Sequence, residues 1–151
     1  MMTAVREAQS QGAVFNPAVV VAQAALESGW GNSGLTVKAN NLFGIKASKS
    51  WTGPTLDLPT KEWSKTKGWY KTVARWCVWP SWTDCVLYYA EMLQRLSWFR
   101  DALPHVNNAD EFLRSLLPEA GQPGWATDPN YFNKVRQAGA EVERLGGPKW
   151  E

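Results

Sequence analysis

The sequence predicts an α+β domain, with helices in both terminal parts of the chain and a small antiparallel sheet between them. Apolar residues recur with helical spacing before residue 29 and again after residue 80, whereas this spacing disappears in 41–79. Within that middle segment, 55–63 and 69–79 alternate between polar side chains and β-branched or aromatic ones, which is typical of a hairpin. Because the strands are grouped rather than interleaved with helices, the pattern favours α+β.

Two helices are expected before the sheet. A short one covers 3–12 and ends at Gly12. The second begins at Asn16-Pro17, where asparagine supplies the N-cap and proline takes the first helical position. It is apolar on nearly all sides, which indicates a central, buried helix, and it ends at Gly29, a left-handed cap residue.

The segment 42–79 is expected to form a β-lobe inserted after the central helix. Its hairpin turns at 64–68, and 42–47 is a candidate for a third short strand.

Helical spacing returns after the β-lobe. Ser81, followed three residues later by Asp84, approximates a capping box. One helix is expected after it, another at 110–117, and a last one from Asp128-Pro129 to about residue 145.

Length and composition restrict the class of protein. The 151 residues fit a single domain, and 44% hydrophobic with 20% charged residues exclude intrinsic disorder. A net charge of +2 gives no electrostatic case for nucleic acid, and no apolar run reaches the ~18 residues that insert into a membrane. The N-terminus lacks the apolar core of a signal peptide. We expect a monomer.

Two cysteines and one histidine leave little room for metal or nucleophilic chemistry. The spacing of Cys77 and Cys85 fits no zinc pattern, so we expect buried thiols rather than ligands or a disulfide. His105 lies in a predicted connection between helices, where a surface or capping role is expected. We therefore expect no metal and no cofactor.

Tryptophan is the compositional anomaly. There are ten, and seven lie between Trp51 and Trp98. Such a surplus fits a surface on which sugar rings, bases or peptides stack, or a tryptophan-rich core, and composition leaves both open.

Glu27 is the acidic residue that its surroundings set apart. It follows a nine-residue stretch, 18–26, in which only Gln23 is polar, and it occupies the last turn of the central helix. Apolar surroundings and the negative end of the helix dipole both raise the pKa of a carboxyl group. A carboxylic acid that stays protonated near neutral pH can act as a general acid. The ordinary alternative is a capping or ion-pairing glutamate.

Three segments resemble a known family. AALESGWG (24–31), NNLFGIK (40–46) and GWATDPNY (124–131) are similar, in this order, to the signatures of glucosaminidase-type peptidoglycan hydrolases. These are glycoside hydrolase family 73 domains of autolysins, phage lysins and flagellum-associated wall hydrolases. The resemblance spans about 5–145 and implies a lysozyme-like fold.

The resemblance also implies a reaction, hydrolysis of the β-1,4 bond between N-acetylglucosamine and N-acetylmuramic acid in peptidoglycan. The family's general acid matches Glu27. Its second acid lies in the β-lobe, where 51–63 is similar to the family region, so Glu62 is the first candidate and Asp57 the second. Inverting, retaining and acetamido-assisted routes remain open.

Five residues are expected to line the sugar groove: Trp30, Asn41, Phe43, Trp125 and Tyr131. Trp125 departs from the family, which usually carries tyrosine there. A ring for stacking remains, but the phenolic hydroxyl is lost. For Asp128, capping of the last helix is the favoured role.

Other functions stay open at this point. A muramidase or lytic transglycosylase would share the fold and the helix-end glutamate, and a non-catalytic module could bind the wall through tryptophans alone. All of these act at the bacterial cell wall, in the periplasm or outside the cell. Without a signal peptide, release as a phage lysin or excision from a larger protein is expected.

Overall fold

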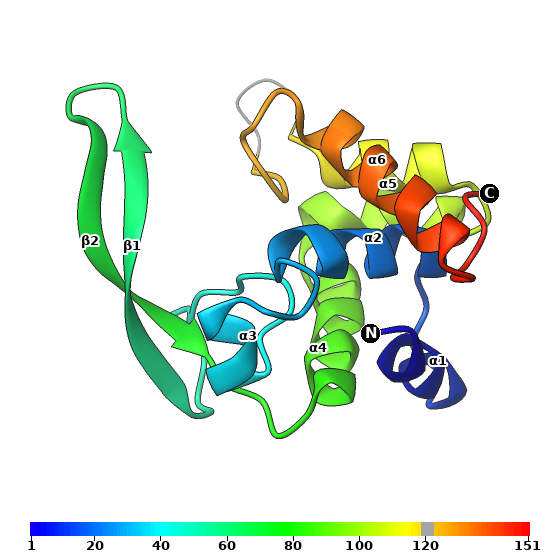
Figure 1. The fold of residues 1–151 in the computed structure, drawn as a ribbon, viewed down its shortest axis with the longest axis horizontal. Coiled ribbons are helices and arrows are strands. Elements are labelled where there is room, and N and C mark those ends of the chain that lie inside the picture. Colours follow the sequence, from blue (N-terminus) through cyan, green and yellow to red (C-terminus); the bar gives the residue numbers. More distant parts are fainter. Residues whose placement is uncertain (119–122) are drawn as a thin grey trace.

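The computed structural model describes residues 1–118 and 123–151, and Figure 1 traces them as helices around a central helix with one long hairpin. In chain order the elements are α1 (Met2–Ser10), α2 (Pro17–Glu27), α3 (Gly34–Ala39), β1 (Thr55–Ser64), β2 (Gly68–Cys77), α4 (Trp82–Arg95), the 3-10 helix η1 (Ser97–His105), α5 (Ala109–Leu116) and α6 (Tyr131–Arg144). The predicted α+β class is confirmed.

Helix α2 forms the centre of the fold, as its apolar composition predicts. The Asn16 side chain accepts a hydrogen bond from the Val19 amide (3.1 Å), and Pro17 occupies the first turn. Residues 18–25 are all buried, because α6 packs against one side of α2 and α1 and α5 also contact it. Figure 1 shows α2 between α6 and α4.

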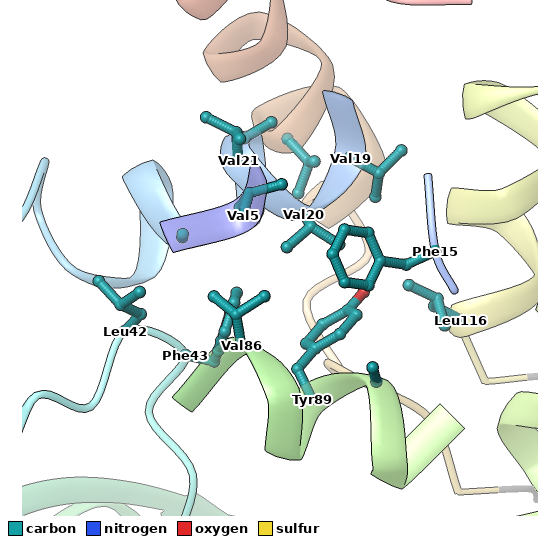
Figure 2. Close-up of a cluster of buried hydrophobic side chains, with 14 of the residues drawn as sticks. Val5, Phe15, Val19, Val20, Val21, Leu42, Phe43, Val86, Tyr89 and Leu116 are labelled. Atoms are coloured by element: carbon teal, nitrogen blue, oxygen red, sulfur yellow. The ribbon is translucent and has the colours of Figure 1, made fainter. Parts of the chain in front are cut away.

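The interior around α2 is closely packed with aliphatic and aromatic side chains (Figure 2). Val19 and Val20 on α2 and Tyr89 on α4 are fully buried, and Phe15 lies edge-on to the Tyr89 ring at 6.3 Å. Cys77 and Cys85 are buried free thiols, as expected. Burial raises the pKa of Cys77 to about 11 and that of Cys85 to about 12, so both stay protonated.

The hairpin has the predicted strands and turn. β1 and β2 pair antiparallel from Thr55 opposite Cys77 to Ser64 opposite Gly68, which has the positive φ (64°) of a turn glycine. In Figure 1 the hairpin extends away from the helices. The predicted third strand at 42–47 is wrong, since this segment makes only an isolated bridge between Lys46 and Trp76.

Two short helical elements lie outside the predictions. α3 has six residues and begins after Ser33, whose hydroxyl caps the Thr36 amide. η1 occupies the segment predicted as a connection, and it contains Pro104 and ends at His105. Both are too short or too irregular to produce a helical hydrophobic repeat.

Helix starts agree with the sequence in one case and differ in another. The Ser81 hydroxyl accepts from the Asp84 amide at 3.1 Å, as the capping box predicts. The last helix begins at Tyr131, later than predicted, because Asp128 instead forms a turn in which its carboxylate accepts from the Asn130 amide (2.8 Å). Asp128 therefore stabilises the loop before α6 and is not its N-cap.

Within the described ranges, none of the helices has both the length and the apolar character needed to cross a membrane.

Candidate active site

Glu27 is presented at the C-terminal end of α2 by a tightly bonded turn. The Ser28 hydroxyl donates to the Ala24 carbonyl (2.5 Å) and accepts from the Gly31 amide (2.8 Å). Gly29 has a positive φ of 56°, which lets the chain leave the helix immediately after Glu27. The backbone around the carboxyl is therefore fixed while its side chain remains exposed.

Glu27 opens into a groove with a volume of about 770 Å³. The walls come from the end of α2, the loop 43–46, the end of α4, η1, the loop 123–128 and the start of α6. The residues that line the groove include Glu27, Phe43, Lys46, Trp125, Asp128 and Tyr131.

Tyr131 and Trp125 contact the Glu27 carboxyl. The buried Tyr131 hydroxyl donates to Glu27 Oε1 at 2.8 Å, and the Trp125 side chain is a second, weaker donor toward the same carboxyl. Although the side chain keeps an opening to solvent, the groove walls partly desolvate the carboxyl and raise the pKa of Glu27; the bonds from Tyr131 and then Trp125 lower it, without cancelling the rise. Glu27 is thus an acid whose proton is retained to higher pH than usual.

Aromatic rings form the wall beside this carboxyl. Trp125 is half-buried and lies edge-on to Phe43, with ring centroids 6.0 Å apart. It also packs against Tyr89 (4.9 Å) and Phe99 (5.8 Å). The structure therefore places Phe43, Trp125 and Tyr131 along the groove of Glu27.

Asn41 is placed elsewhere, and its predicted position in the groove is corrected. Its side chain is only 1% exposed. The amide donates to the carbonyls of Ile45 (2.9 Å) and Cys77 (3.0 Å), and its oxygen accepts from the Ile45 amide (3.0 Å). Asn41 fastens the loop that carries Phe43 to the end of β2, so its contact with the groove is indirect.

Trp30 is also outside the groove. Its backbone is left-handed (φ 58°), and its side chain, 46% exposed, lines a smaller apolar hollow with Trp82 and Val21. Two left-handed residues, Gly29 and Trp30, turn the chain away from Glu27 directly after the C-cap residue Ser28. Sequence proximity to the carboxyl therefore does not make Trp30 its neighbour.

Glu62 approaches the groove through an ion pair. It lies on β1, and its carboxylate pairs with Lys46, which lines the groove. Glu62 itself is not part of the lining. Asp57 pairs with Arg75 (3.3 Å) and, being an odd number of residues from Glu62, points to the opposite face of the hairpin. Of the two candidate second acids, only Glu62 faces the side with the groove wall.

Sequence reasoning missed two contributors to this site. Gln23 donates from Nε2 to the Tyr131 hydroxyl at 3.2 Å, and Lys46 supplies the cation at the groove wall. Gln23 had a signal, since a lone polar residue four positions before Glu27 lies on the same helix face. His105, by contrast, is not among the groove residues.

This geometry suits acid-catalysed cleavage of a long, ring-containing substrate. The sequence profile of the glucosaminidases, described as mannosyl-glycoprotein endo-beta-N-acetylglucosaminidase, matches residues 2–143. The chain belongs to the glucosaminidase family.

Curated relatives in this family share about a third of its residues. Peptidoglycan hydrolase FlgJ of Pseudomonas aeruginosa is 33% identical over 128 residues, which cover 82% of this chain and 31% of that protein. Exo-glucosaminidase LytG of Bacillus subtilis is 34% identical over 121 residues, covering 79% and 41%. This glucosaminidase chain thus spans well under half the length of these curated relatives.

Solved structures of glucosaminidase domains have the same fold. The catalytic domain of the autolysin Auto from Listeria monocytogenes superposes with a TM-score of 0.75 at 28% identity, covering 94% of this chain and 80% of that one. The glycoside hydrolase domain of FlgJ from Salmonella typhimurium gives 0.70 at 28%, covering 96% and 85%. The lysozyme-like fold implied by the sequence resemblance is confirmed.

Proposed function

We propose that this glucosaminidase domain is a peptidoglycan hydrolase that cleaves the β-1,4 bond between N-acetylglucosamine and N-acetylmuramic acid. One observation carries the proposal: a carboxyl group with a raised pKa opens into a groove walled by aromatic rings. Relatives of the chain named peptidoglycan hydrolase and exo-glucosaminidase support the choice of substrate.

Glu27 acts as the general acid. Glycoside cleavage requires a proton on the leaving oxygen and stabilisation of a positive charge at the sugar carbon. Glu27 donates the proton, and the resulting carboxylate is then stabilised by the hydrogen bonds from Tyr131 and Trp125. The ring of Trp125 holds the sugars by stacking, and Phe43, only 4% exposed, packs against Trp125 and supports it.

Glu62 is the second acid. Its carboxylate activates water on the opposite face of the sugar, or it assists the substrate's own acetamido group. The ion pair with Lys46 keeps the Glu62 carboxylate beside the groove wall. Inverting, retaining and assisted routes differ in the separation of the two carboxyl groups in the substrate complex.

The choice between the acids predicts unequal effects. Glu62→Gln lowers the hydrolysis rate on purified sacculi, and the loss is small if the acetamido group assists. Asp57→Asn leaves the rate near wild type, because Asp57 faces away from the wall that carries Lys46. A silent Glu62→Gln together with an inactive Asp57→Asn would reverse the assignment.

Product analysis tests the reaction itself. Wild-type protein is incubated with purified sacculi, and the new glycan ends are identified by mass spectrometry. New N-acetylglucosamine reducing ends support the proposal. N-acetylmuramic acid ends would make the chain a muramidase, anhydro ends a lytic transglycosylase, and binding without release of ends a wall-binding module.

The place of action follows from the substrate. The domain, spanning 1–151, works on glycan strands at the bacterial cell wall, in the periplasm or outside the cell, as a monomer without a cofactor. Nucleic acid is not a partner, since the net charge is only +2.

A further inference from the structure

A buried chain of hydrogen bonds runs across three helices and ends on Glu27. The Tyr89 hydroxyl of α4 donates to Gln23 Oε1 of α2 at 2.7 Å, and Gln23 Nε2 donates to the Tyr131 hydroxyl of α6 at 3.2 Å. Tyr131 then donates to Glu27 Oε1 at 2.8 Å. Figure 2 shows the Tyr89 side chain rising from α4 toward α2 with its oxygen at the far end.

Each link in this chain fixes the direction of the next. An ionised carboxylate only accepts, so Tyr131 must give its single proton to Glu27 and accept from elsewhere. Gln23 can present to Tyr131 either its NH₂ group, which donates, or its oxygen, which would compete with Glu27 for the Tyr131 proton. The Tyr89 hydroxyl engages the Gln23 oxygen and leaves the NH₂ group for Tyr131.

We propose that Gln23 and Tyr89 are positioning residues for the reaction, which orient the Tyr131 hydroxyl so that its proton is donated to the Glu27 carboxylate. This inference rests on the proposed role of Glu27 as general acid. Its catalytic benefit comes after proton donation, when a donor that is already oriented stabilises the new carboxylate without reorganisation.

Burial argues that the chain has a purpose beyond packing. Gln23 and Tyr89 are 0% exposed and Tyr131 is 5% exposed. Every other residue between 18 and 25 is apolar, and an apolar residue at 23 would fill the same space without a polar group to satisfy. The oxygen and the nitrogen of the Gln23 amide each bond one tyrosine hydroxyl, and the series of hydrogen bonds ends at the Glu27 carboxyl in the groove.

The other charged groups of the groove are independent of this chain. Lys46, from the loop after α3, is paired with Glu62, and Asp128 and Lys134, from the loop before α6 and from α6, are paired with each other. Trp125 contacts Glu27 from a separate side-chain donor. Tyr89 also packs against the Trp125 ring (4.9 Å), a ring contact that Tyr89→Phe retains. Loss of the Tyr89 hydroxyl or of the Gln23 amide therefore reaches Glu27 through Tyr131.

The test compares Tyr89→Phe with Tyr131→Phe and with Tyr88→Phe. Tyr88, the neighbour of Tyr89 on α4, has its hydroxyl near Arg95 (3.4 Å), so it is a matched control for loss of one hydroxyl. The Glu27 side-chain carboxyl is titrated by carbon-13 NMR in the free protein, and thermal unfolding checks that each variant is folded.

We expect the Glu27 titration midpoint to move to higher pH in Tyr89→Phe and in Tyr131→Phe, and to stay at the wild-type value in Tyr88→Phe. The double variant Tyr89→Phe/Tyr131→Phe titrates like Tyr131→Phe alone, because both act through one hydrogen bond. In activity assays, the fall in rate on the basic side of the pH–rate profile moves to higher pH in Tyr89→Phe and Tyr131→Phe and stays in place in Tyr88→Phe. Gln23→Met removes the side-chain amide between Tyr89 and Tyr131, and it is expected to move the Glu27 midpoint to higher pH as Tyr89→Phe does.

A wild-type midpoint in Tyr89→Phe would overturn the proposal, as would additive shifts in the double variant. The titration needs no substrate, so it separates this inference from the proposed function. If Glu27→Gln stays active while the midpoints move as expected, the general-acid role fails and the orientation of Tyr131 stands. If Glu27→Gln is inactive and Tyr89→Phe titrates like wild type, the orientation fails alone.

Discussion

Glu27 combines two opposing influences at a single carboxyl group. The crowded groove walls raise its pKa, and donors on Tyr131 and Trp125 lower it. The first favours a proton-carrying acid before the reaction, and the second stabilises the carboxylate that the reaction leaves. The surrounding helix was enough to predict the first influence; the donors come from segments about a hundred residues further along the chain, which local sequence could not place.

The raised pKa has a consequence for stability. The folded state binds the Glu27 proton more tightly than the unfolded state does, so protonation of Glu27 stabilises the fold. This stabilisation is complete below the ordinary glutamate pKa of about 4.3 and is lost as pH rises through the folded-state pKa. Glu27→Gln removes the ionisation. The Tm of Glu27→Gln relative to wild type should therefore increase with pH across that window, as measured by thermal unfolding in a pH series. A constant difference, or one that shrinks as pH rises, would contradict the raised pKa.

Trp125 replaces the expected phenol with an indole and still offers Glu27 a hydrogen bond. Trp125→Phe should keep KM on soluble glycan fragments near wild type, because a ring face remains, and move the Glu27 midpoint upward. The movement is smaller than in Tyr131→Phe, since Tyr131 has the larger effect on the pKa. Trp125→Leu should raise KM about threefold to tenfold, as expected for loss of aromatic stacking. Equal KM values for Trp125→Phe and Trp125→Leu would show that the ring at position 125 does not stack on the sugar.

At the scale of elements, regular patterns predicted the regular structure. Strict alternation specified the hairpin, and a proline after an asparagine cap specified the start of α2. The segment 42–47 has strand-like composition, but Asn41 uses its own amide to bond the backbone there, so a loop with one bridge forms instead of a strand. Side-chain bonds of this kind leave no periodic signal.

The role of Asn41 in this loop predicts a large effect on stability. Asn41→Ala removes the acceptor of the Ile45 amide and the Asn41 donor to the Cys77 carbonyl, whereas the Ile45 carbonyl keeps its bond from the Cys77 amide (3.1 Å). Each buried group left without a partner costs about 1–3 kcal/mol. We expect urea denaturation to report a loss of several kcal/mol, against less than about 0.5 kcal/mol for Asn107→Ala, which alters an exposed residue. If Asn41→Ala lost activity but kept wild-type stability, Asn41 would instead act directly in the groove.

At the scale of the whole molecule, the groove is an assembly of distant segments. Its walls join the end of α2 to the loops before and after the hairpin in the sequence, to η1, which packs against α4 and α5, and to α6, which packs against α2. Motif order in the sequence grouped Phe43, Trp125 and Tyr131, and all three line the groove, since each motif contributes to one wall. It failed for Trp30, because chain reversal at Gly29 and Trp30 turns a sequence neighbour of Glu27 to another surface.

The central claim is that Glu27 delivers the proton that breaks the glycan, and it is tested most directly by the rate of release of reducing ends from purified sacculi by Glu27→Gln. Glu91→Gln is the matched control, because Glu91 is an acid ion-paired to Arg95 on α4 and does not line the groove. We predict that Glu27→Gln loses roughly 10²–10⁴-fold or more of the rate while remaining folded, and that Glu91→Gln keeps wild-type activity. A folded Glu27→Gln protein that releases ends at the wild-type rate would contradict the account.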